Sequence, residues 1–441
     1  MFHDKIKSLF LSSIQSVVST ISDFAVHPDK DFTRRKKFPA DKLLTFPIAE
    51  GSSATKNELL DFFDMDIDKP TDSAFNQQRA KLRPEALEAV FHKFNGSVDS
   101  PGTPPDYRFL AADGLTATFF SRPRFSTDEY FVGSGHSAKG FYSIHINAFY
   151  DLERHTYTDA LLQPVHQKDE FRAFCEIVDR HPVPAGTKNV YIGDRGYCSY
   201  NNMAHVLEKQ QYFLFRTKDI HSKGLVAGFD FPDTGPFDIA VDVALVRSQS
   251  SKIKIESSYR RFVDNATSFD FIEYGSKDTY CLTFRIVRFL IADGVYECVA
   301  TNLPRDKFPP ERIRKLYFSR WGIETSFRKL KYTVGPSNFH AYKPEYVNQE
   351  IWAGMIMYNL TETLMDHTVI KKRGTKHDYK INFSSAVHIC RSFLRPAAEE
   401  RPINVTALLQ KELVPIRNGR KYPRLQTAHF RKPRYFIYRA A

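Results

Sequence analysis

Apolar residues recur at helical spacing through the first hundred residues of the chain. Phe10, Ile14 and Val17 lie three to four positions apart, and serines and a glutamine interrupt them. This spacing predicts an amphipathic helix rather than a secretion signal. A further helical pattern covers TDSAFNQQRAKLRPEALEAVFHKFN, before the Pro-, Gly- and Ser-rich linker SVDSPGTPPDY. We therefore expect residues 1–100 to form a helical N-terminal domain.

The pattern changes to short apolar strands after this linker. Three strand-like segments precede a helix and two further strands, an order typical of an α/β sheet. The strands are YRFLAADGLTATFF, GFYSIHINAFYDL, TYTDALLQPV, NVYIGDRGY and YFLFRTK, and the helix is DEFRAFCEIVDRH. We expect residues 101–217 to form the first part of a mixed sheet with flanking helices.

Residues 218–302 are strand-like, β-branched and aromatic. The pair Asp293-Gly294 lies between two apolar runs and is a hairpin signal, so we predict an all-β insertion into the α/β domain. Helical spacing returns in residues 303–370, where two prolines precede ERIRKLYFSRWGIETSFRKLKY. Residues 371–441 are expected to form a basic C-terminal region.

Composition and charge narrow the class of protein and partner. The chain has 441 residues, of which 42% are hydrophobic, and a formal charge of +12. These values fit a globular protein and favour nucleic acid over a membrane as a polyanionic partner. The five cysteines are scattered without a CxxC pair, so neither a disulfide framework nor a structural zinc site is expected. No apolar run approaches the ~18 residues of a membrane span, and we expect a cytoplasmic protein.

Two aspartates lie at or near the ends of predicted strands. Asp113 follows YRFLAA, and Asp194 follows NVYIG. Ligands collect at strand ends in open α/β sheets, although an aspartate can also simply open a turn there. Together with Glu324 on the later helix, they offer three carboxylates that can bind two Mg²⁺ or Mn²⁺ ions through oxygen atoms.

Four residues of LYFSRWGIETSFRKLKY share one face of a predicted single helix. They are Tyr317, Arg320, Glu324 and Lys331, with successive spacings of three, four and seven residues. Arg320 and Lys331 can hold phosphate oxygens, and Tyr317 can donate a hydrogen bond to a phosphate. The alternative is an exposed ion pair between Arg320 and Glu324, worth roughly a few tenths of a kcal/mol.

The spacing Tyr-x2-Arg-x3-Glu-x6-Lys resembles the signature of the DDE transposases of insertion sequence family four, the YREK-signature group. AADGLTATF and IGDRGY are similar to the two aspartate motifs of that family, in the expected order, and SAFNQQRAKLRPEAL, ATNL and MYNL are similar to further segments. The resemblance covers most of the chain. It implies a ribonuclease H-like catalytic core with a β insertion, in which Asp113, Asp194 and Glu324 are the catalytic residues and bind two Mg²⁺ or Mn²⁺ ions.

The resemblance also implies an activity and partners. A transposase of this group binds double-stranded DNA at terminal inverted repeats, cleaves at the transposon ends, in some members through a hairpin, and joins the 3′-hydroxyls to target DNA. It acts as a homodimer in a synaptic complex at the bacterial nucleoid. The alternatives are a non-catalytic DNA-binding regulator or degenerate transposase, and a metal-dependent nuclease of the same fold.

Several other side chains have two interpretations. Arg195 and Tyr197 follow Asp194 and are candidates to reach DNA, whereas Trp321 is expected in the core and His145 is expected to be structural. Polar residues of the N-terminal domain suit phosphates and base edges or a solvated helix face: Gln77, Gln78, Arg79, Lys81 and Arg83. Aromatic residues of the insertion suit base stacking or a core: Tyr259, Phe262, Phe269, Phe271 and Tyr274. The basic tail can contact DNA or be solvated.

Overall fold

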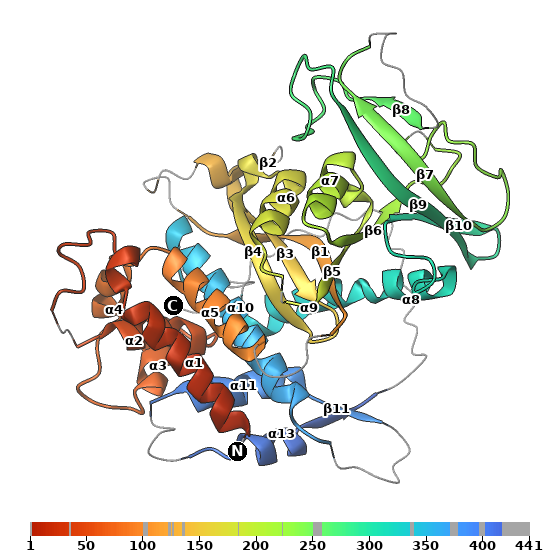
Figure 1. Ribbon diagram of the computed structural model, residues 1–441. Coiled ribbons are helices and arrows are strands. Elements are labelled where there is room, and N and C mark those ends of the chain that lie inside the picture. Colours follow the sequence, from red (N-terminus) through yellow and green to blue (C-terminus); the bar gives the residue numbers. More distant parts are fainter. Residues whose placement is uncertain are drawn as a thin grey trace. The chain divides into compact units, whose positions relative to one another are not determined.

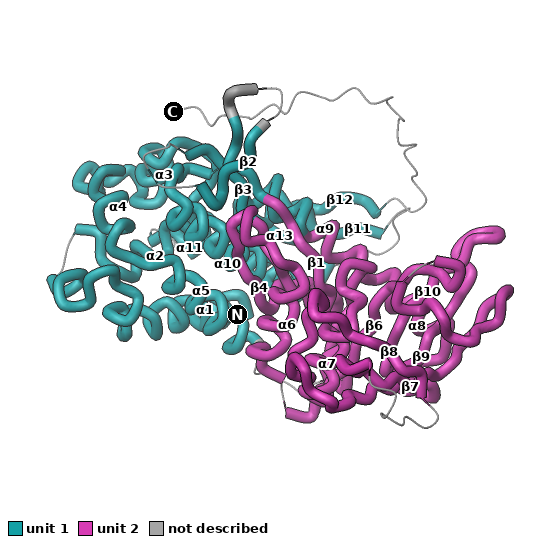
Figure 2. The backbone as a smooth tube through the Cα atoms, turned by 90° about the horizontal axis from the view of Figure 1, so that it is seen from above, with its two compact units in different colours: residues 1–101, 117–144, 327–441 teal, residues 102–116, 145–326 magenta. Residues whose placement is uncertain are grey.

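The chain divides into two compact units, which Figure 2 colours separately. Unit 1 comprises residues 1–101, 117–144 and 327–441, and unit 2 comprises residues 102–116 and 145–326. The computed structural model describes residues 2–34, 37–99, 105–121, 125, 128–134, 137–183, 185–222, 224–249, 258–335, 339–370, 378–396 and 402–416. The basic tail from residue 417 onward lies outside the described residues. Each unit collects segments that are distant in sequence, so the two units do not test the predicted division of the chain into five consecutive parts. That division stays a prediction.

Unit 2 is built on a mixed β-sheet. Its first five strands lie in the order β4-β3-β1-β5-β6, and β5 is parallel to both β1 and β6. The strands are β1 Tyr107–Phe119, β3 Ser137–Asp151, β4 Thr156–Pro164, β5 Lys188–Gly193 and β6 Tyr212–Thr217. This order, with β1 at the centre, is that of a ribonuclease H-like core, so the predicted fold class is confirmed.

The strands of the predicted insertion widen this same sheet. Beyond β6 the order continues β10-β9-β7-β8, with β10 antiparallel to both β6 and β9. The strands are β7 Phe237–Val246, β8 Tyr259–Phe262, β9 Thr279–Ala292 and β10 Val295–Thr301. The insertion contributes strands, as predicted, and these strands join the sheet of the core. β10 covers the unpaired backbone edge that β6 would otherwise expose. The predicted hairpin is confirmed between β9 and β10, where Gly294 has a φ of +68°.

Helices cover both faces of the sheet in unit 2 (Figure 1). On one face, Tyr191 and Phe213 share a buried cluster with Phe174 of α6 (Glu170–Arg180) and Met203 of α7 (Tyr200–Glu208). On the other face, the alternate residues Val190, Ile192 and Leu214 pack with Ile313 and Tyr317 of α8 (Pro310–Ser319). The strands are apolar on both faces because both are covered.

Unit 1 is largely helical, as predicted for the N-terminal segment. Its longest helix is α10, which packs against α2, α5 and α11. Buried residues lie on all sides of α10, as expected for a helix surrounded by others. The helices are α1 Phe2–Val18, α2 Ala40–Ala49, α3 Thr55–Phe62, α4 Asp72–Arg79, α5 Glu85–Asp99, α10 Pro344–Asp366, α11 Phe383–Leu394 and α13 Val405–Lys411.

Three short strands complete unit 1. β2 (Phe131–Ser134) pairs with the first part of β3, and β11 (Tyr379–Ile381) pairs with β12 (Leu413–Pro415). Across the described parts of both units, no helix combines the length and the apolar character needed to cross a membrane.

Candidate active site

Asp113 and Asp194 follow the last residue pair of a parallel ladder. β1 and β5 pair without a shift up to Ala112 opposite Gly193, so the next residue on each strand is an aspartate. Because the two strands are parallel neighbours, both aspartates leave the ladder at the same edge of the sheet. The sequence predicts Asp113 at or near the end of a strand. In the structure β1 continues to Phe119, and only its pairing with β5 ends before Asp113.

Each aspartate also uses one carboxylate oxygen to accept a hydrogen bond from the backbone that follows it. Oδ1 of Asp113 accepts a 2.8 Å hydrogen bond from the N–H of Gly114. Oδ1 of Asp194 accepts a 2.7 Å hydrogen bond from the N–H of Gly196, at the start of the 3-10 turn Arg195–Tyr197. The second carboxylate oxygen of each aspartate takes no part in this bond and stays available for a role in a site.

The predicted single helix from residue 309 to residue 332 is wrong in detail. α8 ends at Ser319, α9 spans Trp321–Lys329, and Leu330–Val334 forms a π-helical turn. At the junction, Arg320 N–H bonds to the Tyr317 carbonyl at 3.1 Å, a three-residue bond tighter than that of an α-helix. Lys331 lies in the π-helical turn and belongs to unit 1, whereas the other predicted site residues belong to unit 2.

Arg320 pairs with two of the three predicted carboxylates. Its Nη2 donates a 2.9 Å hydrogen bond to Oε1 of Glu324, and its Nη1 lies 3.6 Å from Oδ2 of Asp113. The residue is only 6% exposed, so the alternative of a solvated ion pair does not describe it. Within the described residues, Nε of Arg320 is buried without a hydrogen-bond partner, which leaves a donor for a ligand.

The carboxyl group of Asp113 is in an environment that disfavours its charge. Burial, and to a smaller extent the negative charges of Asp194 and Glu324, raise its pKa from 3.8 to about 6, although Gly114 and Arg320 oppose this. The effect of Asp194 and Glu324 on the pKa of Asp113 also indicates that the three carboxylates lie in one electrostatic environment. A raised pKa among like charges is typical of functional sites.

Tyr317 lies in the core rather than at the surface. It is 3% exposed and packs with Ile313 and Phe289. Burial raises the pKa of its hydroxyl, whereas the positive charge of Arg320 and a hydrogen bond with it lower the pKa. In this structure Tyr317 therefore neighbours Arg320, not solvent.

The donor set fits a hard divalent cation. Asp113, Asp194 and Glu324 offer only carboxylate oxygens, which Mg²⁺ and Mn²⁺ prefer. Among the described residues, no group of three or more Asp, Glu, His or Cys side chains is close enough to hold one ion. Arg320 pairs with two of the carboxylates instead, and its positive charge offsets their negative charges. Asp113, Asp194 and Glu324 are thus the residues that would hold the ions.

A polar cavity of about 300 Å³ lies beside Asp194. Basic side chains of Arg195, Arg216 and Lys218 line it, together with Asp219 and Tyr296. Arg195 and Lys218 are exposed. This arrangement suits a phosphate group.

The structure separates the other candidates into exposed and buried residues. Tyr197 is buried, so of its two interpretations the structure favours a core position over contact with DNA. Trp321 is exposed, so the expectation that it lies in the core is wrong. Arg79 is also buried, where it bonds to Gln349 and Glu350, and it is therefore not a surface contact for DNA. Among the insertion aromatics, Phe269 and Phe271 pack in the core, whereas three are exposed: Tyr259, Phe262 and Tyr274.

Sequence reasoning missed one carboxylate near the aspartates. Glu170, the first residue of α6, lies 3.0 Å from Nε2 of His145 and close to the backbone of Gly114. No motif marks Glu170, because its neighbours come from β1 and β3 rather than from its own helix. His145, expected to be structural, is its partner.

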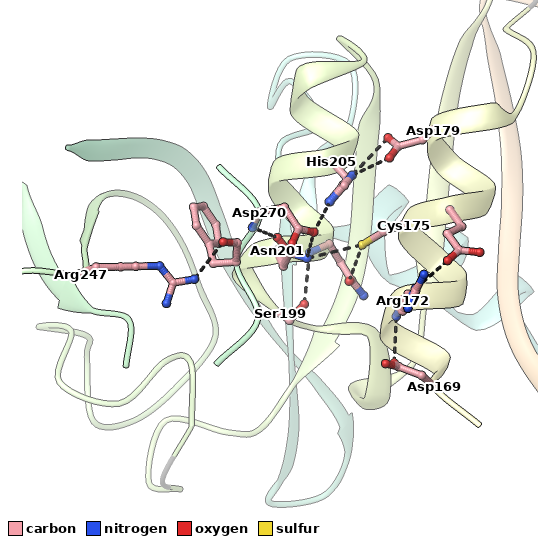
Figure 3. A network of polar contacts seen from close by, with 12 residues as sticks. Asp169, Arg172, Cys175, Asp179, Ser199, Asn201, His205, Arg247 and Asp270 are labelled. Atoms are coloured by element: carbon pink, nitrogen blue, oxygen red, sulfur yellow. Dashed lines mark hydrogen bonds and ion pairs between the residues drawn. The ribbon is translucent and has the colours of Figure 1, made fainter. Parts of the chain in front are cut away.

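A second polar network lies between α6, α7 and the loop that precedes β9 (Figure 3). The ring of His205 lies between Asp179 and Asp270, with Nδ1 3.0 Å from an Asp179 oxygen and Nε2 2.9 Å from Asp270 Oδ2. Asn201 bonds to the side chain and the backbone N–H of Asp270. These residues border a cavity of about 770 Å³. The network attaches the loop to the two helices.

The chain is similar to known proteins in sequence and in fold. The family model described as "Transposase DDE domain" matches residues 104–360. The transposase InsG for insertion sequence element IS4, from Escherichia coli strain K12, is 27% identical over 128 residues, which cover 27% of this chain and 29% of that protein. The match thus spans less than a third of that relative. The solved synaptic complex of piggyBac transposase with hairpin DNA aligns with a TM-score of 0.46 and 11% identity, over 94% of this chain and 86% of that one.

Proposed function

Because the chain belongs to the family of transposases with a DDE domain, we propose that it is a DNA transposase. It binds terminal inverted repeats, cleaves DNA at the transposon ends and joins the 3′-hydroxyl ends to target DNA. A hairpin is one route between cleavage and joining. The observation that carries this proposal is the adjacency of Asp113 and Asp194 at the end of the β1–β5 ladder, with Glu324 linked to Asp113 through Arg320.

In this proposal Asp113, Asp194 and Glu324 hold two Mg²⁺ or Mn²⁺ ions. When bound, such ions neutralise charge on the phosphate and assist displacement at phosphorus. Ion binding requires the Asp113 carboxyl, whose pKa is raised to about 6, to lose its proton. With ions bound, the Arg320 guanidinium would give up part of its pairing with Asp113 and Glu324.

The basic side chains of the signature act on the phosphate. Arg320 presents its unpartnered Nε and the released Nη groups to phosphate oxygens, and Tyr317 holds the guanidinium from the core side. Lys331 supplies a further positive charge to the phosphate. Catalysis by these groups consists of positioning and of stabilising developing negative charge.

DNA is the proposed partner, and a homodimer in a synaptic complex is the proposed assembly. The formal charge of +12 and the cavity bordered by Arg195, Arg216 and Lys218 support contact with the DNA backbone. If several phosphates are neutralised, affinity for the repeats falls steeply with salt concentration. A weak salt dependence would contradict this part of the proposal.

The test is a cleavage assay with Mg²⁺ or Mn²⁺ on DNA that carries the inverted repeats flanking the gene. Wild type is compared with Glu324→Gln and with Glu311→Gln, a change at an exposed glutamate of α8. We expect nicks at the repeat ends with wild type and Glu311→Gln, and none with Glu324→Gln. Binding without cleavage by wild type would favour a regulator or degenerate transposase. Cleavage without joining to target DNA would favour a nuclease.

A further inference from the structure

The carboxylate of Glu170 faces the backbone that follows each aspartate, at Gly114 in β1 and at Gly196 in the 3-10 turn. A Cβ atom built on Gly114 would lie 2.9 Å from Oε1 of Glu170, and one built on Gly196 would lie 4.0 Å from Oε2. The two oxygens of one side chain thus lie against the backbone next to Asp113 and the backbone next to Asp194. Glycine at position 114 permits this approach, because any side chain there would collide with the carboxylate.

His145 holds Glu170 in this place. Its Nε2 lies 3.0 Å from Oε1 of Glu170, and its Nδ1 lies 3.2 Å from the hydroxyl of Thr116 on β1. The ring is 2% exposed, so it has little freedom to move. Lys168 adds a second positive partner, with Nζ 2.9 Å from Oε1. The N-terminus of α6, β1 and β3 are therefore joined at one carboxylate.

The charge of Glu170 belongs to the electrostatic environment of the aspartates. The hydrogen bond with His145, together with Lys168 and against the effect of burial, lowers the pKa of Glu170 to about 2. Burial raises the pKa of Tyr197 well above its ordinary value, and the charges of Glu170, Asp113 and Asp194 raise it further. The pKa of the Tyr197 hydroxyl thus depends on the charges of all three carboxylates. Glu170 itself is ionised at neutral pH.

We propose that Glu170, fixed by His145, is a positioning residue that holds the Asp113–Gly114 segment of β1 and the Asp194–Gly196 turn at a set separation. This role rests on the proposed function, since the separation matters for ion binding by the two aspartates. Groups that orient metal ligands without touching the metal typically change metal affinity or activity by about 10- to 100-fold when removed. Glu170 acts through the backbone at Gly114 and at Gly196, and it does not contact the substrate.

The test compares the full chain carrying Glu170→Ala or Glu170→Gln with the control Glu176→Gln. Glu176 lies on the same helix, and its carboxylate pairs with the exposed Arg172 at 2.7 Å. Hydrogen–deuterium exchange is measured in residues 113–116 and 194–198, Mn²⁺ affinity is measured by calorimetry, and cleavage of repeat-end DNA is measured in single turnover. Thermal unfolding checks that each variant is folded.

In Glu170→Ala we expect faster hydrogen exchange in residues 113–116 and 194–198. Mn²⁺ affinity and cleavage rate should each fall by about 10- to 100-fold. DNA affinity should stay within about twofold of wild type. Glu170→Gln, which keeps the shape, recovers part of the loss, and Glu176→Gln matches wild type. Unchanged hydrogen exchange in residues 113–116 and 194–198 of Glu170→Ala overturns the proposal. Full Mn²⁺ affinity in the same variant also overturns it. A wild-type chain that neither binds Mn²⁺ nor cleaves DNA defeats the proposed function, and the exchange comparison then decides for or against the positioning contact.

Discussion

The Arg320 guanidinium donates a 2.9 Å hydrogen bond to the carboxylate of Glu324, four residues later in the chain. The same guanidinium lies 3.6 Å from Asp113 on the central strand. A local helical pair is thus joined to a residue that only the sheet brings near. The buried arginine serves as the counter-charge that lets two carboxylates share a site.

Replacing Arg320 should reduce cleavage more than it reduces DNA binding. We expect Arg320→Met to lower the single-turnover cleavage rate by about 100-fold or more, because a buried charge that stabilises the reacting phosphate is lost. Arg320→Lys should be intermediate, since an ammonium lacks the fork that reaches both carboxylates. The control is Arg314→Met, at an exposed residue of α8 whose guanidinium lies over the ring of Phe318. Equal losses in the Arg320 and Arg314 variants would contradict the assignment.

Asp113→Asn should stabilise the metal-free protein at neutral pH. The pKa of Asp113 is raised by burial from 3.8 to about 6, so the folded state binds this proton more tightly than the unfolded state. The resulting stability is complete below about pH 4 and is lost as the pH rises through about 6. At neutral pH the variant should gain up to about 3 kcal/mol in the free energy of unfolding.

Urea unfolding in the presence of a chelator measures this effect. Between about pH 4 and about pH 7, the stability of wild type should fall relative to that of Asp113→Asn. Asp306→Asn, at an exposed position of the same unit, should keep the wild-type slope. Identical slopes for wild type and Asp113→Asn would show that the environment of Asp113 does not penalise its charge.

Gly114→Ala should destabilise the protein by about 1–3 kcal/mol, as overpacking of a filled core does. The added Cβ would lie 2.6 Å from Nε2 of His145 and 2.9 Å from Oε1 of Glu170, and the buried His145 ring has no room to withdraw. Gly96→Ala is the control, because nothing lies within 4 Å of the added atom in α5. It should instead stabilise by about 0.5–1 kcal/mol. Urea midpoints measure both changes, and a neutral Gly114→Ala would contradict close packing at the turn.

Arg79→Met should destabilise unit 1 by about 3 kcal/mol, because the Glu350 carboxylate loses its cationic partner. The carboxylate keeps its contacts with His340, so the loss lies at the lower end for a broken buried pair. Arg79 is 3% exposed, and its guanidinium bonds to Gln349 at 2.7 Å, to Glu350 at 3.2 Å and to the Tyr346 carbonyl at 2.6 Å. Chemical unfolding is the measurement, with Lys56→Met at an exposed position of α3 as control. Normal stability combined with weak DNA binding would indicate a surface role for Arg79 instead.

His205→Ala should loosen the loop at residues 264–272. The ring nitrogens of His205 contact Asp179 and Asp270, and the hydrogen bonds from Asn201 and His205 lower the pKa of Asp270 despite the opposing effect of burial. Losing the His205 attachment should speed hydrogen exchange in this loop by roughly tenfold. His221→Ala, at an exposed position, should leave the exchange unchanged. A protected loop in His205→Ala would mean that the hydrogen bonds from Asn201 and Arg247 are enough to hold it.

The sequence by itself determined the features that depend on local spacing. Short apolar and β-branched segments predicted the strands of the sheet, and the Asp293-Gly294 pair predicted the β9–β10 hairpin. The four-residue spacing of Arg320 and Glu324 predicted their contact, because residues at i and i+4 meet on any helical turn. The aspartates were recognisable because a carboxylate directly after an apolar strand is uncommon.

Only the tertiary structure decided the contacts between residues distant in sequence. It placed Asp113 beside Asp194, and it brought Glu170 close to both Gly114 and Gly196. It also buried Arg79 and Tyr197 while exposing Trp321. It also joined the insertion strands to the sheet of the core, through the pairing of β10 with β6. The physical reason is that periodicity shows which face of an element is apolar, whereas strand order and helix packing decide which side chains meet across those faces.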